Sequence, residues 1–366
     1  MTTKELPLVD SPIRGYMMYS YHLAVTFARV PAWPWFYGNH VQLQCDPAQL
    51  ECADFLLDST APKGEVHFTE GTWKFNPWLR DSLQVDKASL ASSVASVSQY
   101  VLDRLDEEFY VETFIDEYHI PVLFNGGVSH LRHRLLIFGC DEKTRRFKII
   151  GFDKSRLYRK LECTFDEFER AFNAVEPLRH ETTKLYRIPA DSSIAVKFEP
   201  ARCAHLLRDY LTSTNTLLDP DLHGKQIDGH GFWYGMNTYR FLEAYVATVM
   251  EVNRGGGSVG VDIRGFNILW EHKTCMSERM KWMRREGFEI SNALIEKYDK
   301  VVSLCGLARN KIVMCGIGLL PRGKGHLIEV PAYLQEAREI ETEVLEELLE
   351  TAMIWDRCEA YMPNAS

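Results

Sequence analysis

The chain has 366 residues, of which 46% are hydrophobic and 25% are charged. This composition is typical of a packed globular protein and excludes a disordered one, and the length favours two domains over one. The net charge of -9 argues against a nucleic-acid partner, because binding to phosphates needs clustered Lys and Arg side chains.

The cysteines and the apolar runs indicate the compartment. Nine cysteines are scattered along the chain and form no C-x-x-C pair, which is typical of free thiols in a reducing environment. The N-terminus lacks the basic-then-apolar order of a signal peptide. No run approaches the roughly 18 apolar residues of a transmembrane helix. The sequence therefore predicts a cytoplasmic protein with no membrane partner.

The first part of the chain predicts both helices and strands. Residues 15–30 are typical of a buried helix, and the aromatic, proline-containing segment 31–46 predicts a rigid, packed loop. Residues 82–118 predict an amphipathic helix followed by a strand of alternating pattern. Two apolar runs at 135–139 and 147–152 flank a polar turn and predict two adjacent antiparallel strands.

A change of character near residue 200 predicts the domain organisation. Thr164, followed three positions later by Glu167, predicts a capping box at the start of a short helix that closes an α/β unit. Farther along, apolar residues at helical spacing predict long helices at 203–212, 233–253, 266–285, 289–308 and 330–355. We therefore expect an α/β (α+β) domain over 1–175, a connector with at most one strand over 176–200, and a mainly α-helical domain over 201–366.

Two residues at neighbouring strand ends are candidates for catalysis. His133 stands immediately before the first apolar run, and Asp153 ends the next one. If a short turn joins the strands, alternation brings both side chains to the same end of the sheet. A carboxylate that accepts the Nδ1 proton of an imidazole leaves Nε2 free to activate a thiol or a hydroxyl. The alternative is a strand-end histidine and a turn aspartate that do not touch.

Several stretches of the chain resemble a known family. IDEYHIP, SHLRHRLLIFGCDEKTRRFKIIGFDKSRLY and TFDEFERAF are similar to the N-terminal domain of the butirosin biosynthesis protein H family. DIRGFNILWEHKTCMSERMKWM is similar to the C-terminal part of relatives found beside nonribosomal peptide assembly lines. The resemblance is strongest over 115–172 and looser elsewhere.

The resemblance implies a papain-like cysteine fold. In such a fold a thiol on an early helix, a histidine at a strand start and an aspartate on the next strand transfer an acyl group. In the family's named member the donor is an acyl carrier protein and the acceptor is an aminoglycoside amine. His133 and Asp153 match the last two positions. At the first position the early helix offers Ser20, and the nearest cysteine is Cys45.

The resemblance leads to three expectations of function. The first is an acyltransferase-like enzyme of natural-product biosynthesis that moves an acyl or peptidyl group from a carrier-protein thioester to an amine or hydroxyl of a small-molecule or peptide acceptor. The chain itself needs no cofactor for this, since the phosphopantetheine belongs to the carrier protein. The second is an accessory or binding subunit that has lost its nucleophile. The third is an amide hydrolase or cyclase that uses the same site.

Other residues are candidates for substrate binding. Trp35, Tyr37 and Asn39 lie in the aromatic segment, which either packs as structure or forms the wall of a pocket. His130 and His133 form an H-x-x-H pair with His119 upstream. No carboxylate or cysteine stands at a familiar ligand spacing, so we expect no metal and a hydrogen-bonding role for His130 near the pocket.

Basic residues in the second half are candidates for carrier-protein docking. They begin at Arg264 and continue along one predicted helix with His272, Lys273, Arg279, Lys281, Arg284 and Arg285. An acidic carrier protein and the phosphate on its prosthetic arm suit a basic helix end. The alternative is an ordinary solvated helix C-terminus, where cations complement the helix dipole.

Overall fold

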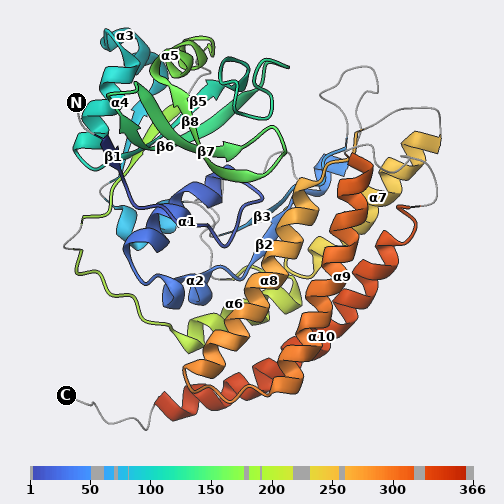
Figure 1. The fold of residues 1–366 in the computed structure, drawn as a ribbon. Helices are drawn as coiled ribbons and strands as arrows, with labels where there is room; N and C mark the ends of the chain where they lie inside the picture. Colours follow the sequence, from blue (N-terminus) through green and yellow to red (C-terminus); the bar gives the residue numbers. More distant parts are fainter. Residues whose placement is uncertain are drawn as a thin grey trace. The chain divides into compact units, whose positions relative to one another are not determined.

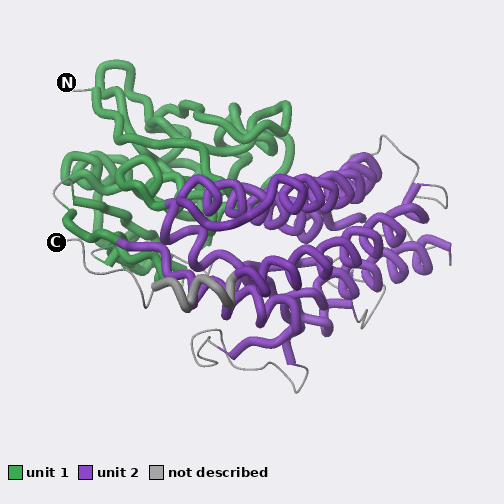
Figure 2. The backbone as a smooth tube through the Cα atoms, turned by 90° about the horizontal axis from the view of Figure 1, so that it is seen from below, with its two compact units in different colours: residues 1–32, 72–195 green, residues 33–71, 196–366 purple. Residues whose placement is uncertain are grey.

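The computed structural model describes most of the chain. The described residues are 3–50, 62–69, 73–80, 82–176, 181–189, 192–216, 231–254, 260–316 and 326–359. The chain divides into two compact units (Figure 2): the sheet unit, residues 1–32 and 72–195, and the helical unit, residues 33–71 and 196–366.

The sheet unit is built on one antiparallel sheet in the order β4-β9-β5-β6-β7-β8, with β1 paired to the end of β6 (Figure 1). Its strands are β1 (Thr3–Glu5), β4 (Leu83–Asp86), β5 (Tyr110–Asp116), β6 (Arg132–Asp141), β7 (Arg146–Phe152), β8 (Tyr158–Thr164) and β9 (Thr182–Tyr186). The expected adjacent strands are confirmed as the β6–β7 pair, which begins at Asp141↔Arg146. Mixed helix and antiparallel sheet is thus the architecture of this unit.

Four helices accompany the sheet: α1 (Met17–Arg29), α3 (Lys87–Ser93), α4 (Val97–Asp106) and α5 (Phe165–Asn173). The expected early helix is confirmed as α1, and it is buried because its apolar residues occupy nearly every face. The expected capping box is also confirmed, with the Thr164 hydroxyl and the Glu167 carboxylate each bonded to the other's backbone N–H. The helix expected before β5 forms as two helices, each capped by its own side chain, Asp86 and Ser96.

The helical unit combines helices with a small antiparallel sheet in the order β10-β2-β3 (Figure 1). Its strands are β2 (Leu43–Cys45), β3 (Val66–Phe68) and β10 (Trp233–Tyr234), and its helices are α2 (Trp33–Asn39), α6 (Pro200–Thr212), α7 (Asn237–Arg254), α8 (Arg264–Arg285), α9 (Asn292–Gly316) and α10 (Val330–Glu359). The mainly helical second half is therefore confirmed. None of the helices in the described residues is both long and apolar enough to cross a bilayer.

The residue ranges of the two units differ from the expected domains, because two segments pair with strands that are distant in sequence. Residues 33–71 belong with the helical unit because β2 pairs with β10, as at Cys45↔Trp233. Residues 182–186 were expected in the connector, but they form β9, which lies between β4 and β5 in the sheet. Pairings between strands so distant in sequence leave no local pattern in the sequence.

Candidate functional site

His133 stands near the start of β6, where the strand pairs with β5 at Ile115↔His133. Its Nδ1 lies 2.5 Å from Oε1 of Glu117, which opens the short 3₁₀ turn directly after β5 (Glu117–His119). The pairing register carries the histidine to the end of β5, and the turn reverses the chain so that the carboxylate meets the ring. We call His133 and Glu117 the dyad.

A third residue holds the carboxylate of the dyad. The side-chain amide of Asn125 donates to Oε2 of Glu117 at 2.7 Å. Burial raises the pKa of the Glu117 carboxyl, but the hydrogen bonds from His133 and Asn125 outweigh this effect, and the pKa lies below its usual value. Glu117 is therefore ionised at neutral pH.

The charge on Glu117 fixes the tautomer of His133. An ionised carboxylate only accepts hydrogen bonds, so Nδ1 of His133 is the donor in its contact with Glu117, and in the neutral ring the lone pair lies on Nε2. The side chain of His133 is 35% exposed, whereas that of Glu117 is 7% exposed. A buried carboxylate thus holds a ring that is partly exposed to solvent.

Asp153 does not form the expected pair with His133. Its Oδ1 accepts the backbone N–H groups of Ser155 and Leu157, and its Oδ2 forms an ion pair with Arg159 at 2.8 Å. Asp153 organises the turn between β7 and β8, and no hydrogen bond or ion pair between described residues joins it to His133.

The strands diverge before they reach these two residues. The β6–β7 ladder ends at Leu136↔Ile150, and beyond it Asp153 pairs instead with Leu123. The hydroxyl of Tyr21, on α1, donates to the carbonyl of Arg134 at 3.0 Å and lies 3.5 Å from that of Ile150, at the point of divergence. The segment around Leu123 therefore lies beside the end of β7, where the hairpin pattern had predicted the start of β6.

Ser20 is buried and already has a partner. The residue is 0% exposed on α1, and its hydroxyl donates to the hydroxyl of Tyr158, on β8, at 2.6 Å. No hydrogen bond between described residues joins Ser20 to His133. A serine becomes a nucleophile when a base removes its proton, so this arrangement does not activate Ser20.

Cys45 is also unsuited to nucleophilic attack. It lies in β2 of the helical unit with 1% of its surface exposed, and burial raises the pKa of its thiol far above the usual value. A reactive cysteine needs its thiolate form and some exposure. Cys45 is therefore a packing residue.

The segment with Trp35, Tyr37 and Asn39 forms a short helix, α2, and not the expected loop. Trp35 and Tyr37 are each 5% exposed. Asn39 donates to the Trp35 carbonyl at 2.8 Å and accepts from Nε of Arg202 at 2.8 Å. These contacts hold α2 within the helical unit, so the expected pocket wall is core structure.

The basic residues of α8 divide into buried and exposed groups. Lys273 and Arg279 are 0% exposed, which excludes them from docking. Nε and Nη2 of Arg279 donate to the carbonyls of Tyr37 and His40, each at 2.7 Å, where α2 ends and its carbonyls need donors. Arg264 is partly exposed but forms ion pairs with Glu65 at 2.6 Å and Asp262 at 2.8 Å. The remaining cations, Lys281, Arg284 and Arg285, line an open pocket.

His130 does not share a site with His133. Its Nδ1 lies 2.5 Å from Oδ2 of Asp116, the last residue of β5. The neighbouring carboxylates Asp116 and Glu117 thus each bind a different histidine of the H-x-x-H pair.

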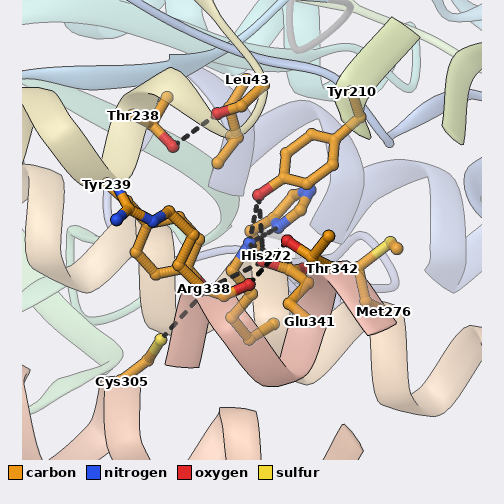
Figure 3. Close-up of polar contacts among 12 residues, drawn as sticks. Leu43, Tyr210, Thr238, Tyr239, His272, Met276, Cys305, Arg338, Glu341 and Thr342 are labelled. Atoms are coloured by element: carbon orange, nitrogen blue, oxygen red, sulfur yellow. Dashed lines mark hydrogen bonds and ion pairs between the residues drawn. The ribbon is translucent and has the colours of Figure 1, made fainter. Parts of the chain in front are cut away.

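A second polar cluster lies inside the helical unit, where each of its five longest helices contributes one side chain. Nζ of Lys273 lies 2.8 Å from one carboxylate oxygen of Glu341 and 2.9 Å from the other. Tyr239 donates to the same carboxylate at 2.8 Å, and Tyr210 donates as well (Figure 3). Tyr298 is the third tyrosine that donates to Glu341. We call these five residues the sealed cluster.

The sealed cluster has no contact with solvent. Lys273, Glu341 and the three tyrosines are all 0% exposed. Burial raises the pKa of each tyrosine well above its usual value, so the hydroxyls stay neutral donors. A fully hydrogen-bonded, enclosed network of this kind organises a core and offers no place for a substrate.

No protein-family model matches the chain, and no curated protein is significantly similar to it. The chemistry of the site therefore rests on the geometry described above.

Glu117 and Asn125 are the site residues that sequence reasoning missed. Glu117 stands in Asp116-Glu-Tyr-His119, directly after a strand pattern. A run of two carboxylates and a histidine at a strand end was a usable signal, because side chains at such ends converge on one edge of the sheet. Asn125 gave no comparable signal, since it lies in a turn whose path depends on β7.

Proposed function

We propose that the chain is an acyltransferase-like enzyme in which His133, anchored by Glu117, acts as general base on the acceptor. The observation that carries this proposal is the contact of 2.5 Å between Nδ1 of His133 and Glu117, with the ring partly exposed. The donor is an acyl or peptidyl carrier protein whose phosphopantetheine bears the thioester, and the acceptor is a small-molecule or peptide amine or hydroxyl.

The buried state of Ser20 and Cys45 favours direct transfer over an acyl-enzyme intermediate. The acceptor nitrogen or oxygen attacks the thioester carbonyl while Nε2 of His133 takes its proton. The carbon–sulfur bond then breaks, and the imidazolium returns the proton to the leaving thiolate. A thioester is activated enough for this route, and Glu117 stabilises the imidazolium that forms between the two steps.

The compartment follows from the same proposal, because carrier-protein thioesters belong to the reducing cytoplasm. Seven cysteines have side chains that the structure describes, and all seven are free and buried, which supports this placement.

The burial of both expected nucleophiles also favours a second candidate, an accessory subunit that binds a carrier protein without catalysis. In that case the only role of the dyad is to stabilise the turn after β5. A hydrolase or cyclase differs from the first proposal only in the group whose proton His133 removes.

The deciding experiment is intact-mass spectrometry of the full chain with carrier proteins loaded with aminoacyl and fatty-acyl groups, first without an acceptor and then with a primary amine as the acceptor. We expect no acyl adduct on the chain before the amine is added, and amide product afterwards. The His133→Asn variant should lower turnover by about two to four orders of magnitude, and Ser20→Ala should leave it unchanged.

Three other outcomes count against the proposal. An adduct on Ser20 or Cys45 would replace direct transfer by covalent catalysis. Full turnover in a folded His133→Asn variant would remove the base. Carrier binding without turnover for any donor would establish the accessory role.

A further inference from the structure

Asp116, His119 and His130 form a second cluster beside the dyad, which we call the triad. One ligand atom from each residue lies within 4.8 Å of the other two. Oδ2 of Asp116 is 2.5 Å from Nδ1 of His130 and 3.9 Å from Nε2 of His119. We propose that the triad binds a divalent transition metal ion, with Zn²⁺ as the best match.

The spacing of the triad is close to that of the ligands around a tetrahedral ion. Ligand bonds of about 2.0–2.2 Å place neighbouring ligand atoms roughly 3.3–3.6 Å apart. One of the observed separations is shorter than this range and the other is longer. His130 is the residue that must move, and its side chain is 68% exposed, so a small rotation of its ring opens the space for the ion.

The carboxylate of the triad is already oriented. Oδ1 of Asp116 accepts the backbone N–H groups of Tyr118 and Leu131, each at 3.1 Å. These bonds leave Oδ2 directed at both imidazoles. Hydrogen bonds to the outer oxygen of a ligand carboxylate are the usual means by which proteins orient a metal ligand.

The two histidines are oriented by one aromatic side chain. The ring of Tyr118 stacks on His130 with centroids 4.2 Å apart, and it meets His119 edge-on at 5.3 Å. Tyr118 thus packs against both rings.

The ligand types select the class of ion. Two imidazoles and one carboxylate suit Zn²⁺ and its neighbours in the first transition series, whereas Mg²⁺ and Ca²⁺ prefer oxygen ligands throughout. Three protein ligands leave a fourth position for water or a substrate oxygen. This assignment does not depend on the role of His133, because the dyad uses a different carboxylate and a different histidine.

The test is calorimetric titration of ZnCl₂ into the full chain, prepared without a histidine tag and treated with EDTA. We expect one Zn²⁺ per chain and a higher melting temperature. Asp116→Asn keeps an oxygen for the two backbone N–H groups but loses the charge, and it should weaken binding by about 10–100-fold. His119→Ala and His130→Ala should weaken it at least as much. Co²⁺ in place of Zn²⁺ should give the intense visible bands of a four-coordinate site.

The helical unit offers a matched control. The partly exposed His205 and the buried Asp209 form a pair with Nε2 and Oδ1 3.8 Å apart, and His205→Ala should bind Zn²⁺ as the unchanged chain does. The proposal is overturned if the chain takes up no Zn²⁺, or if folded His119→Ala and His130→Ala variants bind it as tightly as the unchanged chain. Neither result bears on turnover by His133, so this proposal and the proposed function fail separately.

Discussion

The dyad and the sealed cluster are made of similar groups but differ in their access to solvent. Each pairs a nitrogen base with a glutamate, and each glutamate accepts further hydrogen bonds. In the dyad the base is partly exposed and only the glutamate is buried. In the sealed cluster both members are 0% exposed, and Tyr210, Tyr239 and Tyr298 also donate hydrogen bonds to Glu341.

Exposure of one partner separates a candidate site from a structural network. A base does chemistry only if a substrate reaches it, and the partly exposed side chain of His133 is open to solvent. The ammonium group of Lys273 is fully buried, and it donates its hydrogen bonds to Glu341 and Tyr210. The following predictions test this contrast.

Removal of Glu341 should have the largest effect on stability. Glu341→Ala leaves the Lys273 charge buried without its carboxylate, which typically costs about 3–5 kcal/mol in the free energy of unfolding. Denaturant unfolding followed by circular dichroism measures this loss. Glu343→Ala on the same helix is the control, since that side chain is 64% exposed in its ion pair with Lys297 and should change stability by about 0–1 kcal/mol. A loss below the control's value would contradict the structural role.

Acid should destabilise the helical unit through His272. Its Nε2 lies 2.7 Å from the Val41 carbonyl, and burial, with the adjacent Lys273 charge, lowers the pKa of the ring well below 6.5. Below pH 6.5 the unfolded chain therefore binds up to one more proton than the folded chain. As the pH decreases, the free energy of unfolding decreases by up to about 1.4 kcal/mol per pH unit.

The measurement for His272 is unfolding at several pH values between 7 and 5. His272→Gln keeps a donor for the Val41 carbonyl and should flatten the dependence on pH. The carboxylates of Glu117 and Asp116 affect stability at lower pH, because their pKa values lie below the usual values. Their contribution to the free energy of unfolding is fully present above the usual pKa values, and it is lost as the pH falls through the lowered pKa values. An unchanged slope in His272→Gln would exclude His272 as the source.

Removal of Asn125 should have the smallest effect. Asn125→Ala deletes the hydrogen bond to Oε2 of Glu117, and we expect a loss of about 0.5–1.5 kcal/mol in the free energy of unfolding. If Asn125 positions the dyad, the kcat for the carrier-protein donor should fall as well, with KM unchanged. A fall in stability with an unchanged kcat would limit Asn125 to a structural role.

Local patterns predicted the elements well. The capping box at Thr164, the buried helix α1 and the β6–β7 pair each depend on residues close together in sequence, and each was confirmed. The mainly helical second half followed from periodic apolar residues in the same way. Such signals are complete within one segment, so a single sequence contains them.

Contacts between distant segments were not predictable. The place of β9 in the sheet and the pairing of β2 with β10 involve partners far apart in the chain. The partner of His133 was missed for the same reason, because hairpin register alone points to Asp153. In the structure the segment around Leu123 pairs with Asp153, and Tyr21 contacts β6 where the two strands diverge. Lys273 and Arg279 had the pattern of a solvated helix face, and only tertiary packing buries them.

Turnover of two variants identifies the carboxylate that serves His133. Glu117→Gln removes the anion that holds the Nδ1 proton, and Asp153→Asn makes the matching change at the residue that hairpin register favours. With an acyl carrier donor, Glu117→Gln should lower kcat by about two to four orders of magnitude. Asp153→Asn should stay within about threefold of the unchanged chain, because its carboxylate serves a turn and Arg159. The opposite pattern, with Glu117→Gln active and Asp153→Asn inactive, would contradict this account.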